Sequence, residues 1–317
     1  MLKVSTDKFS AGRSKSLEKE FRRSTKLFSL DKKKLLEYSL GMTLKNKNRI
    51  FLFLFIFSAI IFLFNVAVLC IAAFEKSIVP PTNPMRPFVL IPKGGLCKYN
   101  FNSSLAAIIT FSLSAPALSI AIFKGFEKTP SLEILFFSGF IISCVTESAR
   151  ILLPLFGFWK TNSLFLIYIG RIVAAGRFLA PMSLFFAAVF SSAEELQNAE
   201  RNIFILLAST CAFGFFYPMD TTITTSTCTV LWGFRKFFAV IRVFIAVVTI
   251  FSVLAEAYTK GIKGIYIKAA GVVVLAAGYG LLCNTDCWLE FFIAAVLYVS
   301  GCILYLKTVH YLENTWS

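Results

Sequence analysis

Long apolar runs separated by short polar stretches dominate the chain after residue 49. A helix needs about 20 mostly apolar residues to cross the hydrocarbon core of a bilayer, and each run is long enough. The pattern therefore predicts an all-α, polytopic membrane helix bundle with eight transmembrane helices. The predicted spans are 50–73, 104–123, 132–153, 163–190, 202–218, 231–255, 264–283 and 289–307.

The fourth run is the longest, and glycine and proline interrupt it at Gly170, Gly176 and Pro181. Both residue types weaken the interior of a helix. One kinked or tilted helix fits this pattern, and so does a helix broken into two pieces. Between the fifth and sixth runs, the stretch 219–230 is rich in threonine and serine. We predict a low-complexity polar loop there, with ligand-binding hydroxyls as the alternative.

The first 49 residues differ in composition from the rest of the chain. Apolar residues such as Leu17 and Phe21 recur among basic ones at loosely helical spacing. One or two helices lying on the membrane surface fit this spacing, and a solvated tail fits equally well. We divide the chain into a basic juxtamembrane segment, 1–49, and a transmembrane domain, 50–317.

Charge composition supports a membrane protein and indicates its orientation. Only 15% of the residues are charged, against about 25% in typical soluble domains. There are 32 Lys and Arg against 17 Asp and Glu, a net charge of +15. The basic N-terminal segment favours contact with anionic lipid or a protein partner over nucleic acid. The positive-inside rule then places both termini in the cytoplasm, although Arg235 and Lys236 count against this orientation. We expect the bundle to lie in the plasma membrane.

Four cysteines fall on the outer side or at the outer boundary in this orientation. An oxidising compartment would allow one or two disulfides among them, and a reducing one would keep them as thiols. Spacing does not fix the connectivity. The four residues are Cys97, Cys228, Cys283 and Cys287.

Charged residues inside the predicted spans mark a candidate site. A charge at the bilayer centre costs roughly 2.5–3.5 kcal/mol on insertion scales, so such residues pair, line a cavity or serve function. The third, fourth and sixth spans place one carboxylate and four guanidinium groups in the outer half of the membrane. The surplus positive charge predicts an anion-binding cavity. Its residues are Glu147, Arg150, Arg171, Arg235 and Arg242.

A structural interpretation of the same residues stays open. Arg150 and Arg235 can reach outer headgroups, since long basic side chains extend to the interface. Glu147 can pair with Arg171 or Arg242 to join helices. Arg177 lies deeper and would extend a polar path inward, as in a transporter, whereas Glu256 fits an ordinary boundary residue.

Residues needed for most membrane-embedded chemistry are missing from the sequence. The single histidine, His310, lies in the C-terminal tail, so no serine has a histidine partner inside the membrane. No glycine-rich phosphate loop and no acidic cluster for Mg²⁺ is present. We therefore expect no enzymatic activity, no cofactor and no metal.

The leading functional hypothesis is a non-enzymatic anion- or lipid-binding module with a sensor or receptor role. One N-terminal span followed by seven is similar in helix count to seven-span bacterial sensor modules, and no motif assigns residues on that ground. A small transporter of an organic anion or lipid is the first alternative. A structural subunit of a membrane complex is the second.

Overall fold

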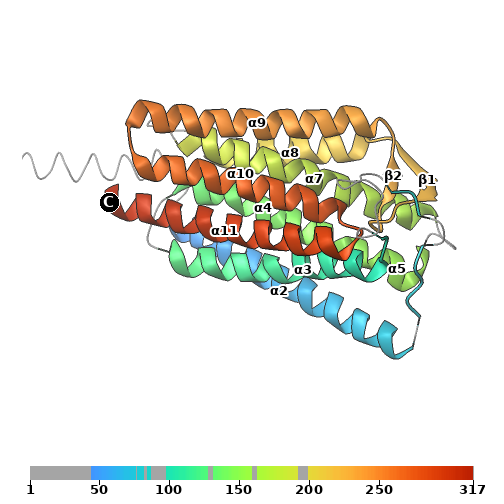
Figure 1. The fold of residues 1–317 in the computed structure, drawn as a ribbon. Coiled ribbons are helices and arrows are strands. Elements are labelled where there is room, and N and C mark those ends of the chain that lie inside the picture. Colours follow the sequence, from blue (N-terminus) through green and yellow to red (C-terminus); the bar gives the residue numbers. More distant parts are fainter. Residues whose placement is uncertain are drawn as a thin grey trace, which may run out of the picture. The chain divides into compact units, whose positions relative to one another are not determined.

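The computed structural model describes residues 44–75, 77–81, 84–86, 98–127, 131–158, 163–191 and 199–316. Eight helices in these ranges are long and apolar enough to cross a membrane, by length and composition (Figure 1). The predicted all-α polytopic bundle is confirmed. One of the eight spans, Leu132–Phe156, contains two helices, α4 and α5. In chain order the described helices are α2 (Leu44–Phe74), α3 (Phe101–Gly125), α4 (Leu132–Ser148), α5 (Leu152–Phe156), α7 (Ser163–Ser191), α8 (Ala199–Phe216), α9 (Arg235–Lys260), α10 (Lys263–Asn284) and α11 (Trp288–Trp316). Most of the juxtamembrane segment lies outside the described residues.

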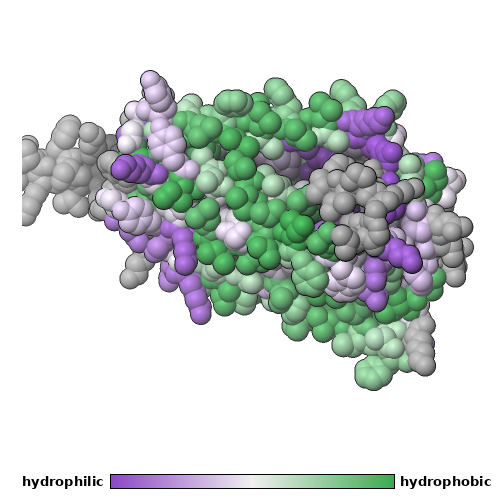
Figure 2. Space-filling model, viewed as in Figure 1, coloured by the Kyte–Doolittle hydropathy of each residue, from purple (hydrophilic) through white to green (hydrophobic). Residues whose placement is uncertain are grey.

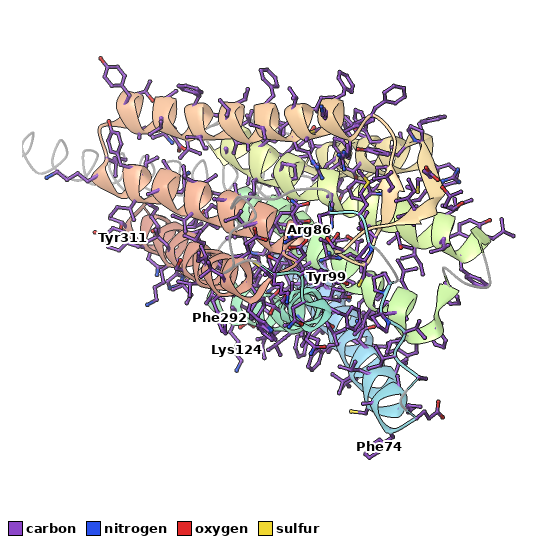
Figure 3. All side chains as sticks on the ribbon, turned by 45° about the vertical axis from the view of Figure 1, so that its right-hand side comes forward. Phe74, Arg86, Tyr99, Lys124, Phe292 and Tyr311 are labelled. Carbon is purple, nitrogen blue, oxygen red and sulfur yellow. The ribbon has the colours of Figure 1, made fainter. Side chains whose placement is uncertain are left out.

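The outward faces of these helices are as apolar as their core. Along α9, Val240, Phe244 and Phe251 are exposed, while few side chains of this helix are buried. Phe74, at the end of α2, points away from the bundle in Figure 3. Figure 2 shows hydrophobic surface across the middle of the helices and hydrophilic groups toward their two ends. This distribution suits a bilayer, because lipid solvates apolar surface and water solvates the ends.

Two prolines shape the third and fourth spans. The third span consists of α4, a 3₁₀ turn at Ala149–Ile151 and α5. Pro154 has no N–H to donate to the carbonyl four residues earlier, which fits the tighter turn at that point. The fourth span is one continuous helix, α7, with Pro181 inside it. The structure thus selects the single-helix alternative over the broken one.

A β-hairpin occupies most of the predicted polar loop. Strand β1 (Met219–Thr224) pairs antiparallel with β2 (Val230–Trp232), and Met219 lies opposite Trp232. The loop prediction was wrong, and α9 starts at Arg235, four residues after the predicted start of the sixth span at residue 231. Threonine is β-branched and favours extended backbone, so a threonine-rich stretch pairs readily as strands. We call the end of the bundle that carries β1 and β2 the hairpin end, and the end where α9 joins α10 the turn end.

The tip of the hairpin is buried between helices. Residues Thr225 to Thr229 are all less than one-tenth exposed. Thr225 Oγ1 donates to the Thr229 carbonyl at 2.8 Å, and Ser104 of α3 donates to the Ser226 carbonyl at 2.9 Å. These hydroxyls hydrogen-bond to one another and to the backbone. The hairpin tip is therefore a buried structural element, and its hydroxyls are not exposed to bind a ligand.

Glycines let α10 and α11 approach closely. A Cβ added at Gly278 would lie 2.3 Å from the Tyr298 backbone nitrogen, and one at Gly301 would lie 2.5 Å from that of Leu275. Real Cβ atoms do not approach backbone so closely, so both positions require glycine. Small residues at helix contacts are typical of membrane bundles, where close packing replaces the hydrophobic effect.

Candidate functional site

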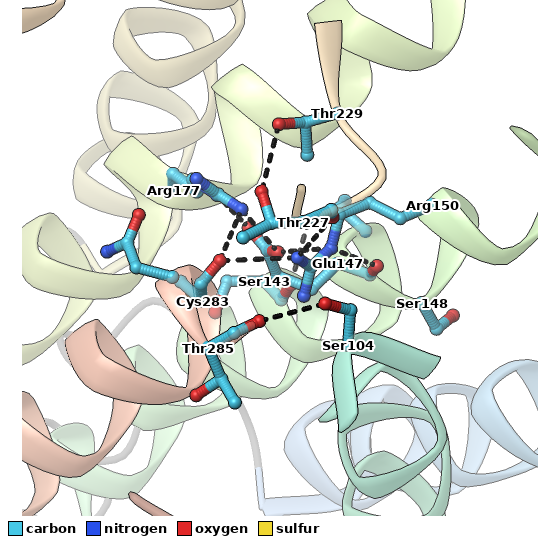
Figure 4. A network of polar contacts seen from close by, with 12 residues as sticks. Ser104, Ser143, Glu147, Ser148, Arg150, Arg177, Thr227, Thr229, Cys283 and Thr285 are labelled. Atoms are coloured by element: carbon cyan, nitrogen blue, oxygen red, sulfur yellow. Dashed lines mark hydrogen bonds and ion pairs between the residues drawn. The ribbon is translucent and has the colours of Figure 1, made fainter. Parts of the chain in front are cut away.

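Glu147, in the last turn of α4, is the centre of a buried ion network. Its side chain is 0% exposed. Arg150 Nε lies 2.9 Å from one carboxylate oxygen. Arg177 of α7 donates from Nε to the other oxygen at 2.7 Å. One carboxylate therefore holds two guanidinium groups and joins the third span to the fourth (Figure 4).

The carboxyl end of α10 completes the network. Arg150 Nη1 and Arg177 Nη2 donate to the Cys283 carbonyl at 3.2 and 3.0 Å. The last carbonyls of a helix lack partners within the helix and carry the negative end of its dipole, so they suit cations. Arg150 Nη1 also donates to the Thr227 carbonyl in the hairpin tip at 3.1 Å. Four parts of the chain thus meet at these two arginines (Figure 4).

Both network arginines stand four residues before a proline, at Arg150–Pro154 and Arg177–Pro181. Proline cannot donate to the carbonyl four residues earlier, so the backbone at each arginine is freed from one helical hydrogen bond. This repeated spacing is a signal in the sequence that could have picked out Arg177. The site predicted from the sequence omitted Arg177, because this residue lies deeper in the fourth span than Arg171.

Trp232, in β2, lies against two arginines. The guanidinium carbon of Arg177 is 4.7 Å from the centre of the Trp232 ring, and that of Arg242 is 5.9 Å from it. Both distances fall within the range of cation–π contacts. Tyr217 packs edge-on against the same indole at 5.5 Å. Burial raises the pKa of Tyr217 to about 12, although the positive charges of Arg242 and Arg177 oppose the shift.

Arg242 has no acceptor among the described residues. No hydrogen bond or ion pair reaches its guanidinium there, and its contact is the face of Trp232. Arg242 lies seven residues, about 10 Å, into α9, nearer the start of this 26-residue helix than its predicted position in the middle of the sixth span. Arg242 is therefore the charge that this cluster leaves uncompensated.

Several buried N–H groups at the hairpin end also lack acceptors within the described part of the chain. Arg171 lies over the Phe215 ring at 4.9 Å, and its Nε has no partner. All four such nitrogen atoms are donors from arginine or tryptophan. They are Arg150 Nη2, Arg171 Nε, Trp232 Nε1 and Arg235 Nη1.

The structure corrects the pairing expected for Glu147. The partners predicted for it across helices, Arg171 and Arg242, do not contact it; Arg177 does. Arg150 does not extend to headgroups, since it is 1% exposed and bonded within the bundle. Depth along the predicted spans could not resolve which face of α7 each arginine occupies.

A second buried ion network, at the turn end, was missed by the sequence analysis. Lys268 of α10 lies 2.9 Å from Glu256 and 3.3 Å from Glu133. Lys260 also pairs with Glu256 at 3.0 Å, and Tyr305 donates to Glu133 at 2.8 Å. Glu256 is thus not an ordinary boundary residue. Glu133 and Lys268 lie close to predicted span ends, where charged residues are common and do not by themselves indicate a site.

The cysteines at the hairpin end differ in oxidation state. Cys287 is disulfide-bonded, whereas Cys228 and Cys283 are free thiols. The prediction for Cys97 lies outside the described residues. Potential ligand atoms of Asp286, Cys287 and Glu290 lie within 4.8 Å of one another. The sulfur of Cys287 is not available as a thiolate, so this group is a poor metal site.

The Asp286 carboxylate accepts hydrogen bonds from two side chains. Arg86 Nε and Ser226 Oγ donate to its carboxylate at 2.6 and 2.8 Å. The hydrogen bond to Asp286 raises the pKa of Arg86. This pair fastens the segment around Arg86 to the loop between α10 and α11, and Figure 3 shows Arg86 near that end of the bundle.

Comparison with known proteins finds a protein that is similar to part of this chain. No family model matches the chain, and no solved structure matches it. The chain is similar to an uncharacterized protein of Treponema pallidum (strain Nichols), with 33% identity over 128 residues. The match covers 39% of this chain and 35% of that protein. The chain thus spans about a third of the length of this relative.

Proposed function

We propose that this protein is a non-enzymatic, multi-pass membrane module that binds an anionic ligand at the hairpin end, with a sensor or receptor role. The observation that carries the proposal is a surplus of cationic donors. Arg150, Arg177 and Arg242 contribute three positive charges and Glu147 one negative charge, a balance of +2. An uncompensated buried charge is costly, so a bound anion would stabilise this arrangement.

The chemistry of the donors indicates a carboxylate or a phosphate as the ligand group. A guanidinium donates two parallel hydrogen bonds that match the geometry of these oxyanions. The indole N–H of Trp232 supplies a neutral donor beside Arg242. Figure 2 shows hydrophilic atoms in a recess beneath α9, between hydrophobic side chains. A soluble organic anion and a lipid headgroup present the same acceptor atoms to such a site.

Replacing Arg242 tests the proposal. The purified protein is titrated with inorganic phosphate, succinate and dihexanoylphosphatidic acid, and its thermal unfolding temperature is recorded. We expect at least one of these anions to stabilise the wild type. Arg242→Gln should weaken that anion by roughly 10- to 100-fold, because a charged hydrogen bond contributes about 1.5–3 kcal/mol.

Lys236→Gln is the matched control, since Lys236 is exposed on the same helix and loses the same charge. It should leave the titration unchanged. Stabilisation of Arg242→Gln equal to that of wild type would overturn the proposal, and so would the failure of all three anions to stabilise the wild type. Stabilisation by succinate and phosphate but not by dihexanoylphosphatidic acid would indicate a soluble ligand.

Transport of an organic anion or lipid is the second candidate function. The network at the turn end favours transport, because it places a second group of charges on the helix that carries the first. Glu133 and Glu147, one from each network, lie 14 residues apart on α4, about 21 Å along the helix axis. Between them, Phe137 stacks on Tyr305 and Phe140 packs against Tyr279. Flux of labelled phosphate or succinate into proteoliposomes distinguishes a transporter from a sensor, which binds without flux. Constant co-purification with another membrane protein would favour the structural-subunit alternative.

A further inference from the structure

Two carboxylates at the turn end share Lys268 unequally. The ammonium nitrogen lies 2.9 Å from Glu256 Oε2 but 3.3 Å from Glu133 Oε2. The longer distance is beyond the usual range of N–H···O bonds, so the shorter bond is the stronger one. Glu256 has Lys260 as a second ammonium partner at 3.0 Å. Lys268 therefore neutralises Glu256 better than it neutralises Glu133.

Glu133 receives its closest hydrogen bond from a neutral group. The Tyr305 hydroxyl donates to Oε1 at 2.8 Å. A hydroxyl stabilises a carboxylate by hydrogen bonding but brings no opposite charge. Glu133 is 7% exposed and Lys268 is 2% exposed, so water contributes little. A buried carboxylate with incomplete charge compensation is the group in this network that gains most from taking up a proton.

Three ionisable groups of the described residues face Glu133. They are Lys268 of α10, Glu256 of α9 and Tyr305 of α11, with Lys260 reaching it through Glu256. On the α7 side, α4 packs with apolar side chains, among them Leu179 and Ala187. The protonation of Glu133 is therefore controlled by this network.

A hydrogen-bonded route connects Glu133 to the surface. Lys260 is 39% exposed and bonds to Glu256 Oε1, and Glu256 Oε2 in turn accepts from Lys268. Lys268 then contacts Glu133. Proton exchange along such a chain needs no open channel, because each group can pass a proton to its neighbour. The buried carboxylate is thereby linked to water at the turn end.

We propose that Glu133 is a proton-binding site inside the bundle. A proton from water at the turn end adds to the Glu133 carboxylate, forming an O–H bond and a neutral carboxylic acid. The Tyr305 hydroxyl, which donates to the carboxylate, then accepts from the acid. Lys268 gives a proton to Glu133 and receives one by way of Lys260 and Glu256, so it ends with its charge and its bond to Glu256 unchanged. The site does not depend on anion binding at the hairpin end.

Infrared spectroscopy of the purified full-length protein tests the proposal directly. A buried carboxylic acid gives a C=O stretching band that its carboxylate lacks. We expect this band to grow in the wild type as the pH is lowered from neutral to mildly acidic. Glu133→Gln should abolish it, whereas Glu75→Gln, which replaces an exposed glutamate, should leave it unchanged. A full band in Glu133→Gln would overturn the proposal.

Two further variants keep the test decisive where Glu133→Gln does not fold. Tyr305→Phe removes the donor that stabilises the carboxylate, so the band should appear at higher pH. Glu256→Gln leaves Lys268 to face Glu133 without a competing carboxylate, so the band should appear at lower pH. A band that shifts in neither variant would contradict the assignment to Glu133.

Discussion

Glu147 lies between guanidinium groups that belong to two different spans, Arg150 just after α4 and Arg177 in α7. All three side chains are less than one-tenth exposed. A buried ion pair adds little over an apolar pair of the same shape, but breaking it leaves a charge without compensation. The stability of this region therefore depends on keeping the carboxylate charged.

Neutralising Glu147 should destabilise the bundle strongly. Glu147→Gln leaves Arg150 and Arg177 without their carboxylate, and losing one partner of a buried pair costs about 3–5 kcal/mol. Denaturant unfolding in detergent measures the loss. Glu75→Gln makes the same chemical change at an exposed position and should be neutral. Equal stability of the two variants would show that Glu147 has no structural role.

Cys228 combines burial with an uncommon backbone conformation. It is 1% exposed and has a φ of 53°, in the left-handed region. Burial raises the pKa of its thiol to about 12, although the positive charge of Arg150 opposes the shift. The reactive form of cysteine is the thiolate, so a raised pKa keeps the thiol protonated and inert at neutral pH.

We expect Cys228 to resist a water-soluble maleimide in the folded protein at neutral pH and to react after denaturation. Labelling followed by peptide mass spectrometry measures this. A cysteine placed on the exposed part of the hairpin by Thr222→Cys should react in the folded state and is the positive control. Rapid labelling of Cys228 without denaturation would contradict its burial.

At the scale of residues, the sequence located the charged region but not its pairs. Glu147 and Arg150 stand three residues apart, a spacing that puts them on one helix face. Depth along the span could not choose Arg177 over Arg171, because that choice depends on how α7 is rotated against α4. Rotation is set by packing, including the close contact of Gly176 with Thr146. Depth does not contain this information, and the spacing of Arg177 and Pro181 is the sequence signal that remains.

The helices themselves were predictable because apolar length dominates their formation in lipid. The predicted spans match the eight helices, with ends displaced by a few residues, as from 104 to Phe101 at the start of α3. The hairpin was not predictable in the same way. Its strands are short, and its polar tip is buried by contacts with α3 and with Arg150 of the third span, which lie far away in sequence.

The contact between α10 and α11 should tolerate no side chain at Gly278. Gly278→Ala places a methyl group against the backbone of Tyr298, and overpacking of this kind typically costs about 1–3 kcal/mol. Gly280→Ala is the matched control, because a Cβ there meets nothing within 4 Å. Unfolding temperatures of the two variants measure the difference. Equal values would mean that the helices are packed less closely than the structure shows.

Considered as a whole molecule, the protein keeps its buried charges in two networks at different depths. The Glu147 network lies toward the hairpin end and the Lys268 network toward the turn end. Rings of Phe137, Phe140 and Tyr279 lie between them. The first network has surplus positive charge and suits an anion, whereas the second has a carboxylate that suits a proton. These two chemistries together are what a proton-coupled transporter would need, and each can be tested without the other.

Which side of the membrane each end faces is a prediction about the whole chain. The dense basic residues before the first span predict that the turn end is cytoplasmic and the hairpin end is outside. In intact cells, a membrane-impermeant maleimide should label Thr222→Cys, because this residue is exposed in β1. Lys263→Cys, exposed at the start of α10, should be labelled only after the cells are permeabilised. The reverse pattern would invert the topology and place the arginine cluster toward the cytoplasm. Labelling of both positions from one side would contradict a membrane crossing by α9, because α9 is the membrane-length helix between residues 222 and 263 in the sequence.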